Sequence, residues 1–132
     1  MLEILPAPDH VVAMKLSGVA TSNDYDRIIA TIEEKLASHD CIGLYCDLEA
    51  FEDITAHAIA KDLRYTFGKL GELKRFPRAA VVTQKDWLRT LVKMWNPVLP
   101  RVEMRAFDPA ERDAALLWVG EHVRGAHAPG GV

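Results

Sequence analysis

The sequence lacks the features that mark several classes of protein. Its 132 residues include only two cysteines, Cys41 and Cys46, which excludes a disulfide-stabilised miniprotein. On one strand their Cα atoms would lie about 16 Å apart, too far for a disulfide. No apolar run is long enough to cross a bilayer, and the opening residues do not resemble a signal peptide. We therefore expect a cytoplasmic protein with reduced thiols.

The charge is small in total but unevenly distributed. The net charge of −3 argues against a general nucleic-acid binder, so we expect no nucleic-acid partner. Residues 1–60 carry three basic and eleven acidic groups, residues 61–105 carry eleven and four, and residues 106–132 carry two and four. The acidic and basic blocks could pack together and neutralise each other. Alternatively, the basic block could face an anionic partner.

The hydrophobic pattern predicts a single α/β domain over residues 1–124, followed by a flexible tail at 125–132. Alternating strands and helices indicate a mixed, mostly parallel sheet of five strands with four helices. The first strand pairs antiparallel with the second through a hairpin. Strands are expected at 2–5, 10–16, 41–48, 78–83 and 102–107, and helices at about 22–38, 55–73, 85–96 and 109–123.

The third predicted helix has an unusually wide apolar face. A core-facing helix needs an apolar stripe somewhat over 100° wide, and here the arc covers about 160°. The surplus could meet a ligand, a second subunit or a bilayer, or neighbouring core could cover both edges. The arc contains Trp87, Leu88, Leu91, Val92, Met94 and Trp95, and the opposite half carries Lys85, Arg89 and Lys93.

A polar cluster follows the predicted strand at 41–48. Open α/β sheets hold their sites at the carboxyl ends of strands, where paired carboxylates with a histidine could act as acid and base or bind a divalent ion. The simpler interpretation is that these residues cap a helix, end a strand or face solvent. The scattered histidines show no metal-ligand spacing, and we expect neither a metal nor a cofactor. The cluster comprises Asp47, Glu49, Glu52, Asp53, Thr55 and His57.

Several segments are similar to the SpoIIAA-like (STAS-like) family of small bacterial proteins. These are the strand and helix start at 78–87, the strand at 102–108, the helix segment at 114–119 and the opening strand that ends at Ser17-Gly18. The resemblance covers nearly the whole chain. It implies a βα superhelix, a cytoplasmic protein that could form a homodimer, and no catalytic set. Since CRAL-TRIO lipid-transfer domains share this fold, it also implies binding of hydrophobic ligands and association with membranes.

The better-known relatives are anti-sigma-factor antagonists, which are switched by phosphorylation of a serine that follows an aspartate. The matching segment here reads Asp53-Ile54-Thr55, so Ile54 occupies the acceptor position and Thr55 comes next. The acidic residues around it would repel a phosphate. The resemblance therefore implies, as an alternative function, a STAS-type regulatory module for protein interaction that uses Asp53 and Thr55.

Our main hypothesis is a non-enzymatic module that binds a hydrophobic or lipid-like ligand or a membrane surface. The second and third helices would form a movable flap over the ligand. Headgroups would be attracted by Lys85, Arg89 and Lys93, each contributing about 1 kcal/mol near an anionic surface. An enzyme that uses the acidic cluster is a third hypothesis. The predicted ligand-binding residues are Leu63, Phe67, Leu91, Met94 and Trp95, with Trp87 at the rim.

Overall fold

The computed structural model describes residues 1–68, 74–97 and 102–130, without the side chains at 63, 66, 67, 95 and 122–130. The elements are β1 (Leu2–Leu5), β2 (Val11–Leu16), β3 (Gly18–Ala20), α1 (Ser22–Leu36), β4 (Gly43–Asp47), β5 (Phe51–Ile54), α2 (Ala56–Gly68), β6 (Arg78–Val82), α3 (Asp86–Trp95), β7 (Glu103–Phe107), the 3₁₀ turn η2 (Pro109–Glu111) and α4 (Arg112–Gly130). The predicted order of strands and helices is confirmed.

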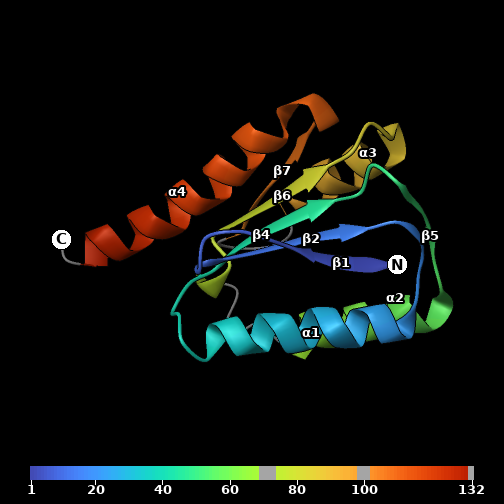
Figure 1. Ribbon diagram of the computed structural model, residues 1–132, viewed down its shortest axis with the longest axis horizontal. Helices are drawn as coiled ribbons and strands as arrows, with labels where there is room; N and C mark the ends of the chain where they lie inside the picture. Colours follow the sequence, from blue (N-terminus) through green and yellow to red (C-terminus); the bar gives the residue numbers. More distant parts are fainter. Residues whose placement is uncertain (69–73, 98–101, 131–132) are drawn as a thin grey trace.

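The main sheet has five strands in the order β1-β2-β4-β6-β7. Only β1 runs antiparallel to its neighbour, and the other pairs are parallel. The expected mixed, mostly parallel sheet with four helices is therefore confirmed. The helices α1 and α2 lie side by side on one side of the sheet, and α4 lies on the other (Figure 1).

A second, two-stranded sheet was not predicted. After β2 and β4, the chain bends and pairs again as β3 and β5. Gly18 makes this bend with a φ of 63°, and its N–H donates to the carbonyl of Ala50 at 2.9 Å. We expected the strand simply to end at Ser17-Gly18. The pairing carries both chain segments to the starts of α1 and α2.

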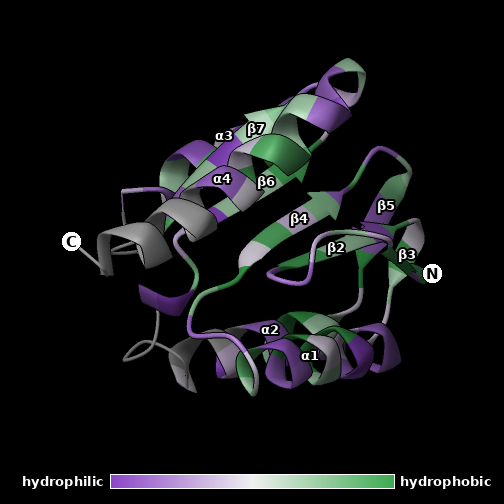
Figure 2. Ribbon diagram, turned by 60° about the vertical axis from the view of Figure 1, so that its left-hand side comes forward, coloured by the Kyte–Doolittle hydropathy of each residue, from purple (hydrophilic) through white to green (hydrophobic). Residues whose placement is uncertain are grey.

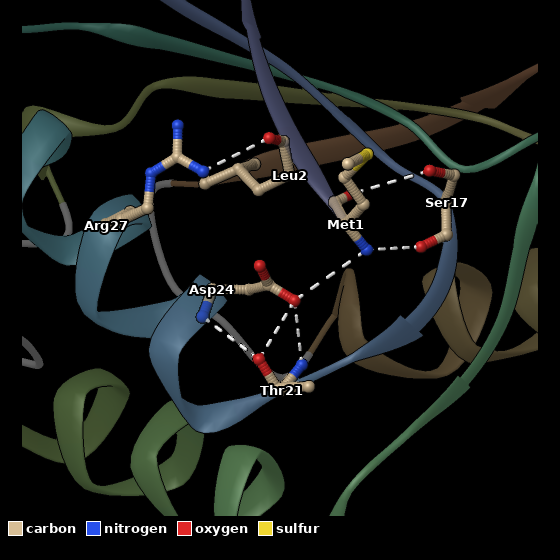
Figure 3. A network of polar contacts seen from close by, with 6 residues as sticks. All are labelled: Met1, Leu2, Ser17, Thr21, Asp24 and Arg27. Carbon is tan, nitrogen blue, oxygen red and sulfur yellow. Dashed lines mark hydrogen bonds and ion pairs between the residues drawn. The ribbon is translucent and has the colours of Figure 1, made fainter.

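Local polar contacts fix both ends of α1. At the start, the Asp24 carboxylate accepts hydrogen bonds from the N–H and hydroxyl of Thr21 and lies 3.8 Å from the Met1 ammonium (Figure 3). Burial raises the pKa of Asp24, but these bonds and charges outweigh it, so the pKa lies below its ordinary value. At the other end, Arg75 donates to the carbonyls of Leu36, His39 and Asp40.

Two hydrophobic clusters pack on the two faces of the main sheet. The first joins α1 and α3 to one face through residues such as Ile28, Ile32 and Leu88. Hydrophilic residues line the outer side of α1 (Figure 2). The second cluster joins α4 to the opposite face. There α4 comes so close to β4 that a Cβ on Gly43 would lie 2.9 Å from the carbonyl oxygen of Val119.

The last helix is longer than expected. It runs to Gly130, so the helix end predicted near Val123 is wrong. A glycine such as Gly125 costs a helix only about 1 kcal/mol, which is too little to end it by itself. The domain limits and the flexibility of residues 125–132 stay predictions. Within the part of the chain that the structure describes, no helix is long and apolar enough to cross a membrane.

Candidate ligand site on the sheet

The two faces of the main sheet are covered to very different extents. On the face toward α4, the side chains of the inner strands are fully enclosed. Tyr45 is 4% exposed, Ala80 is 1% exposed and Val82 is 0% exposed. Parallel strands in the middle of a sheet are ordinarily buried on both faces by helices. The face toward α4 follows that rule.

The opposite face departs from the rule. Two rows of side chains cross β4, β6 and β7 in register on this face, and every residue in them is only partly buried. The residues of β2 in register with these rows, Val12 and Met14, are buried. The partial exposure therefore begins at the central strand, β4. We call these residues the open rows. They are Leu44, Ala79 and Met104 in one row and Cys46, Val81 and Ala106 in the other.

The positions of the helices explain why the open rows, although they pack against the first hydrophobic cluster, are only partly covered. Helix α1 packs on β2, α3 packs along the edge strand β7, and α2 packs against α1 (Figure 1). The open rows therefore lie between the α1–α2 pair and α3. Because β4 is the middle strand, the partial exposure of Leu44 and Cys46 indicates an incompletely covered area between these helices, which we call the hollow. An apolar hollow of this kind is the usual setting for a small-molecule site.

The wide apolar face of α3 is only half covered. Leu88 and Val92 are buried, whereas Trp87 is 50% exposed, Leu91 39% and Met94 61%. The interpretation that neighbouring core covers both edges of this arc is therefore wrong. Large apolar residues that stay exposed together on one side of a helix indicate an unfilled binding surface.

Two contacts show which way the exposed part of α3 points. The ring of Trp87 lies 6.2 Å from that of Phe51, which follows β4 in the sequence. On the other side of the helix, Arg89 pairs with Asp108 beyond the edge strand β7. Trp87 therefore lies beside the start of β5, on the side of α3 away from the contact between Arg89 and Asp108.

An acidic residue of α2, Asp62, lies near the buried stripe of this helix. It is on the same stripe of the helix as the fully buried Ala58, four residues earlier, and Tyr65, three residues later. Its residue surface is nevertheless exposed. Burial raises the pKa of the carboxyl above its ordinary value.

The charge of Asp62 acts on two other titratable groups. Burial, and then the charges of Asp47 and Asp62, raise the pKa of the Cys46 thiol to about 12. Burial and the Asp62 charge also raise the pKa of Tyr25 on α1. The thiol and the phenol therefore stay protonated at neutral pH.

The structure places the other predicted ligand residues in different settings. Leu63 and Phe67 belong to α2 and Trp95 to α3, but their side chains lie outside the described residues. Another apolar residue of α2, Ile59, is 44% exposed. It lies about 100° around the helix from Ala58, on the side away from the contact between Lys61 and Asp26 of α1. Whether these residues bind a ligand stays a prediction.

The predicted basic stripe is partly occupied by contacts within the protein. Arg89 is engaged by Asp108, Lys85 occupies the N-cap position of α3, and Lys93 is exposed. On the helical wheel this stripe lies on the far side of α3 from Trp87 and Met94. Headgroup contacts by these three residues stay a prediction.

The acidic cluster after β4 is largely structural. Asp47 is buried and accepts a hydrogen bond from Arg112 Nε at 2.8 Å, and Glu49 pairs with the same guanidinium. Thr55 accepts the N–H of Ala58 at 3.1 Å, which confirms that it caps α2. No group of three or more His, Cys, Asp or Glu residues suited to a metal is found among the described residues. A regulatory role for Asp53 and Thr55 stays a prediction.

Neither the open rows nor Asp62 was singled out from the sequence. A signal for the rows was present, because Cys46, Ala79 and Ala106 are small residues in strands expected to be buried. Asp62 also carried a signal, because it follows Ala58 by one helical turn. Without the structure, nothing showed that Ala58 marks the buried side of α2.

Comparisons with known proteins agree with the fold. A crystal structure of an uncharacterized protein of the DUF3478 family from Shewanella loihica, which has a SpoIIAA-like fold, superposes with a TM-score of 0.71. The two sequences are 24% identical, and the match covers 90% of this chain and 92% of that chain. A comparison with curated proteins finds no match. A family model described as SpoIIAA-like matches residues 11–120, and the chain therefore belongs to the SpoIIAA-like family.

Proposed function

We propose that the protein is a non-enzymatic binding module whose ligand is a hydrophobic or lipid-like small molecule held in the hollow. The SpoIIAA-like fold indicates a STAS-type module, and such modules generally bind partners rather than catalyse reactions. The observation that carries the proposal is the exposure of the open rows in the middle of the sheet. Ala79 is partly exposed, whereas Ala80, its neighbour on the same strand, is 1% exposed.

The chemistry of the hollow supports an apolar ligand. Its floor consists of aliphatic and sulfur-containing side chains, and α3, which packs along β7, carries the exposed Trp87 and Leu91. Covering apolar surface gains roughly 25 cal/mol per Å², so an alkyl chain or ring system would bind here without any charged contact. The exposed Trp87 would lose contact with water in the process. Its fluorescence therefore offers a direct signal of binding.

Titration with a neutral apolar dye such as N-phenyl-1-naphthylamine tests the proposal. We expect saturable binding to the wild type and displacement of the dye by 1-octanol. Ala79→Phe should abolish binding by filling the hollow from its floor. Leu117→Ser, which removes a 64% exposed leucine from α4, is the matched control and should bind as the wild type does. Dye binding that survives Ala79→Phe but is lost in Leu117→Ser would overturn the assignment of the site.

A membrane surface is the other occupant that the apolar face of α3 could meet. Co-sedimentation with anionic vesicles at low salt tests it, and Lys93→Glu is the informative variant because Lys93 is exposed. If the hollow takes a soluble ligand, the protein stays in the supernatant with and without octanol. Sedimentation that Lys93→Glu prevents would favour the membrane surface instead. A homodimer stays a prediction that sedimentation velocity would test.

A further inference from the structure

The strand β1 forms one edge of the main sheet, and its backbone shows which groups point outward. At its start, the Ser17 N–H donates to the Met1 carbonyl at 2.9 Å, and the Met1 ammonium donates to the Ser17 carbonyl at 2.5 Å. Hydrogen-bonded pairs alternate along an antiparallel ladder, so every second residue from Met1 bonds to β2. The N–H and C=O groups of Leu2 and Ile4 therefore point away from the sheet.

One of these outward groups already has a partner. Arg27 of α1 donates from Nη1 to the Leu2 carbonyl at 3.2 Å, which agrees with the outward direction of that carbonyl (Figure 3). Among the described residues, neither the N–H nor the C=O of Ile4 has a partner, and its side chain is 40% exposed. An edge strand with open backbone groups and an exposed apolar side chain is a template for pairing with another chain.

The opposite edge of the sheet is better covered. It is formed by β7, where the Met104 N–H donates to the side-chain oxygen of Asn96 at 2.9 Å and α3 packs along the strand. On β1, by contrast, the bond from Arg27 covers one carbonyl and leaves Ile4 open. We therefore looked for the partner strand that fits β1.

A second copy of β1 can pair antiparallel about a two-fold axis, and each choice of central residue gives a different register. Centring on Glu3 places two carboxylates directly opposite each other, which is destabilising. Centring on Leu2 sets the N–H of Leu2 in one copy against the Leu2 carbonyl of the other, where Arg27 already donates. Both registers are therefore unfavourable.

The register centred on Ile4 fits better than the one centred on Leu5. Centring on Leu5 leaves the Ile4 carbonyl opposite Pro6, which has no N–H to donate. Centring on Ile4 lets the two Ile4 residues exchange both of their hydrogen bonds, and the Leu2 N–H meets the Pro6 carbonyl. The Leu2 carbonyl then faces the proline nitrogen, and it keeps its bond from Arg27. Every outward group of the strand has a partner in this register.

We propose that β1 is a self-association edge, at which two copies of the chain pair their β1 strands about Ile4 and join their main sheets into one. The exposed side chains of the two Ile4 residues then meet, and Glu3 lies beside Leu5 of the other copy instead of beside a second carboxylate. The strand has four residues, so the contact is small and the dimer depends on protein concentration. This interface is separate from the hollow and does not depend on the proposed function.

Sedimentation velocity over a range of protein concentrations tests the association. We expect the wild type to shift from monomer to dimer as the concentration rises. Ile4→Lys should raise the dissociation constant about 10-fold or more, because it places two like charges opposite each other at the axis. Val19→Lys makes the same kind of change at a 48% exposed valine of β3 and should dimerise as the wild type does. Circular dichroism verifies that both variants are folded.

Disulfide crosslinking tests the register. The Cα atoms of a hydrogen-bonded pair lie about 5.5 Å apart, which a disulfide can span. Ile4→Cys, in a Cys41→Ser background that removes one partly exposed thiol, should therefore form a covalent dimer under mild oxidation. In the same register the Cα atoms of the two Glu3 residues would lie about 8 Å apart, so Glu3→Cys is the matched control and should stay monomeric.

The outcomes decide the proposal. A wild type that stays monomeric at every concentration, or a dimer that Ile4→Lys leaves intact, would overturn it. Crosslinking of Glu3→Cys in place of Ile4→Cys would overturn the register, and so would the absence of any crosslink at concentrations where the wild type is dimeric. None of these results changes the binding of the apolar dye, so failure of this proposal and failure of the hydrophobic site are distinguishable.

Discussion

Replacing Ala79 and Ala80 separately by leucine tests whether one face of β6 is open. The two residues are adjacent on the same strand, so the change in chemistry and strand propensity is the same. Ala80 is 1% exposed beneath α4, whereas Ala79 lies in the open rows. We expect Ala79→Leu to be neutral or stabilising and Ala80→Leu to be destabilising.

The magnitudes follow from the space that each side chain meets. Leucine adds three carbons, and at about 0.8 kcal/mol per buried CH₂ the new contact with the hollow is worth about 2 kcal/mol at most. Ordering the side chain costs about 0.5–1 kcal/mol. Ala79→Leu should therefore raise the free energy of unfolding by about 1 kcal/mol. On the covered face, overpacking costs typically 1–3 kcal/mol, so the two variants should differ by about 2–4 kcal/mol.

Urea denaturation followed by circular dichroism measures both free energies of unfolding. Equal destabilisation by Ala79→Leu and Ala80→Leu would refute the reasoning, because it would show that both faces are packed to the same density. If the Ala79→Leu variant is more stable and also binds the apolar dye more weakly, the added side chain occupies the same space as the dye.

Three further predictions concern the packing and charges around the site. Gly43→Ala should lower the free energy of unfolding by about 1–3 kcal/mol in urea titrations, because its Cβ would lie 2.9 Å from the Val119 carbonyl oxygen. Arg112→Met should cost about 2 kcal/mol in the same assay, because the buried Asp47 carboxylate loses its cationic partner and keeps only the hydrogen bond from the Glu49 N–H. Burial raises the pKa of the Asp62 carboxyl above its ordinary value of 3.8. The folded chain therefore keeps the carboxyl proton to higher pH than the unfolded chain does. As a result, the free energy of unfolding falls as the pH rises from about 3.8 through the folded-state pKa. Asp62→Asn should therefore be more stable than the wild type at pH 7 and should lose this advantage below about pH 3.8. Thermal unfolding of both proteins at several pH values measures the difference. A stability advantage that does not change with pH would contradict the prediction.

The sequence was sufficient to predict the main sheet, because apolar runs and helical periodicity report directly on burial. The strands at 2–5 and 78–82 were located to within one residue at either end. The small sheet of β3 and β5 was missed because each strand continues another after a bend. Its three or four residues carry no periodicity of their own, and only the pairing with a distant segment reveals them.

The site was predictable only in part. The excess apolar face of α3 could be recognised from the helical wheel, and the exposure of Trp87 and Met94 agrees with it. The partner of Arg89 could not be predicted, because Asp108 reaches it only through the packing of α3 on β7. The open rows depend on where three helices lie across the sheet. No local pattern in the sequence contains that information.

Methyl NMR during a titration with 1-octanol tests the central claim most directly, because the two faces of the sheet serve as probe and control in one sample. We predict saturable shifts in the methyl signals of Leu44, Ala79 and Val81, which lie in the open rows. The methyl signals of Ala80 and Val82, enclosed beneath α4, should stay in place. Shifts that do not saturate, or that affect both faces equally, would contradict a hydrophobic ligand site on this face.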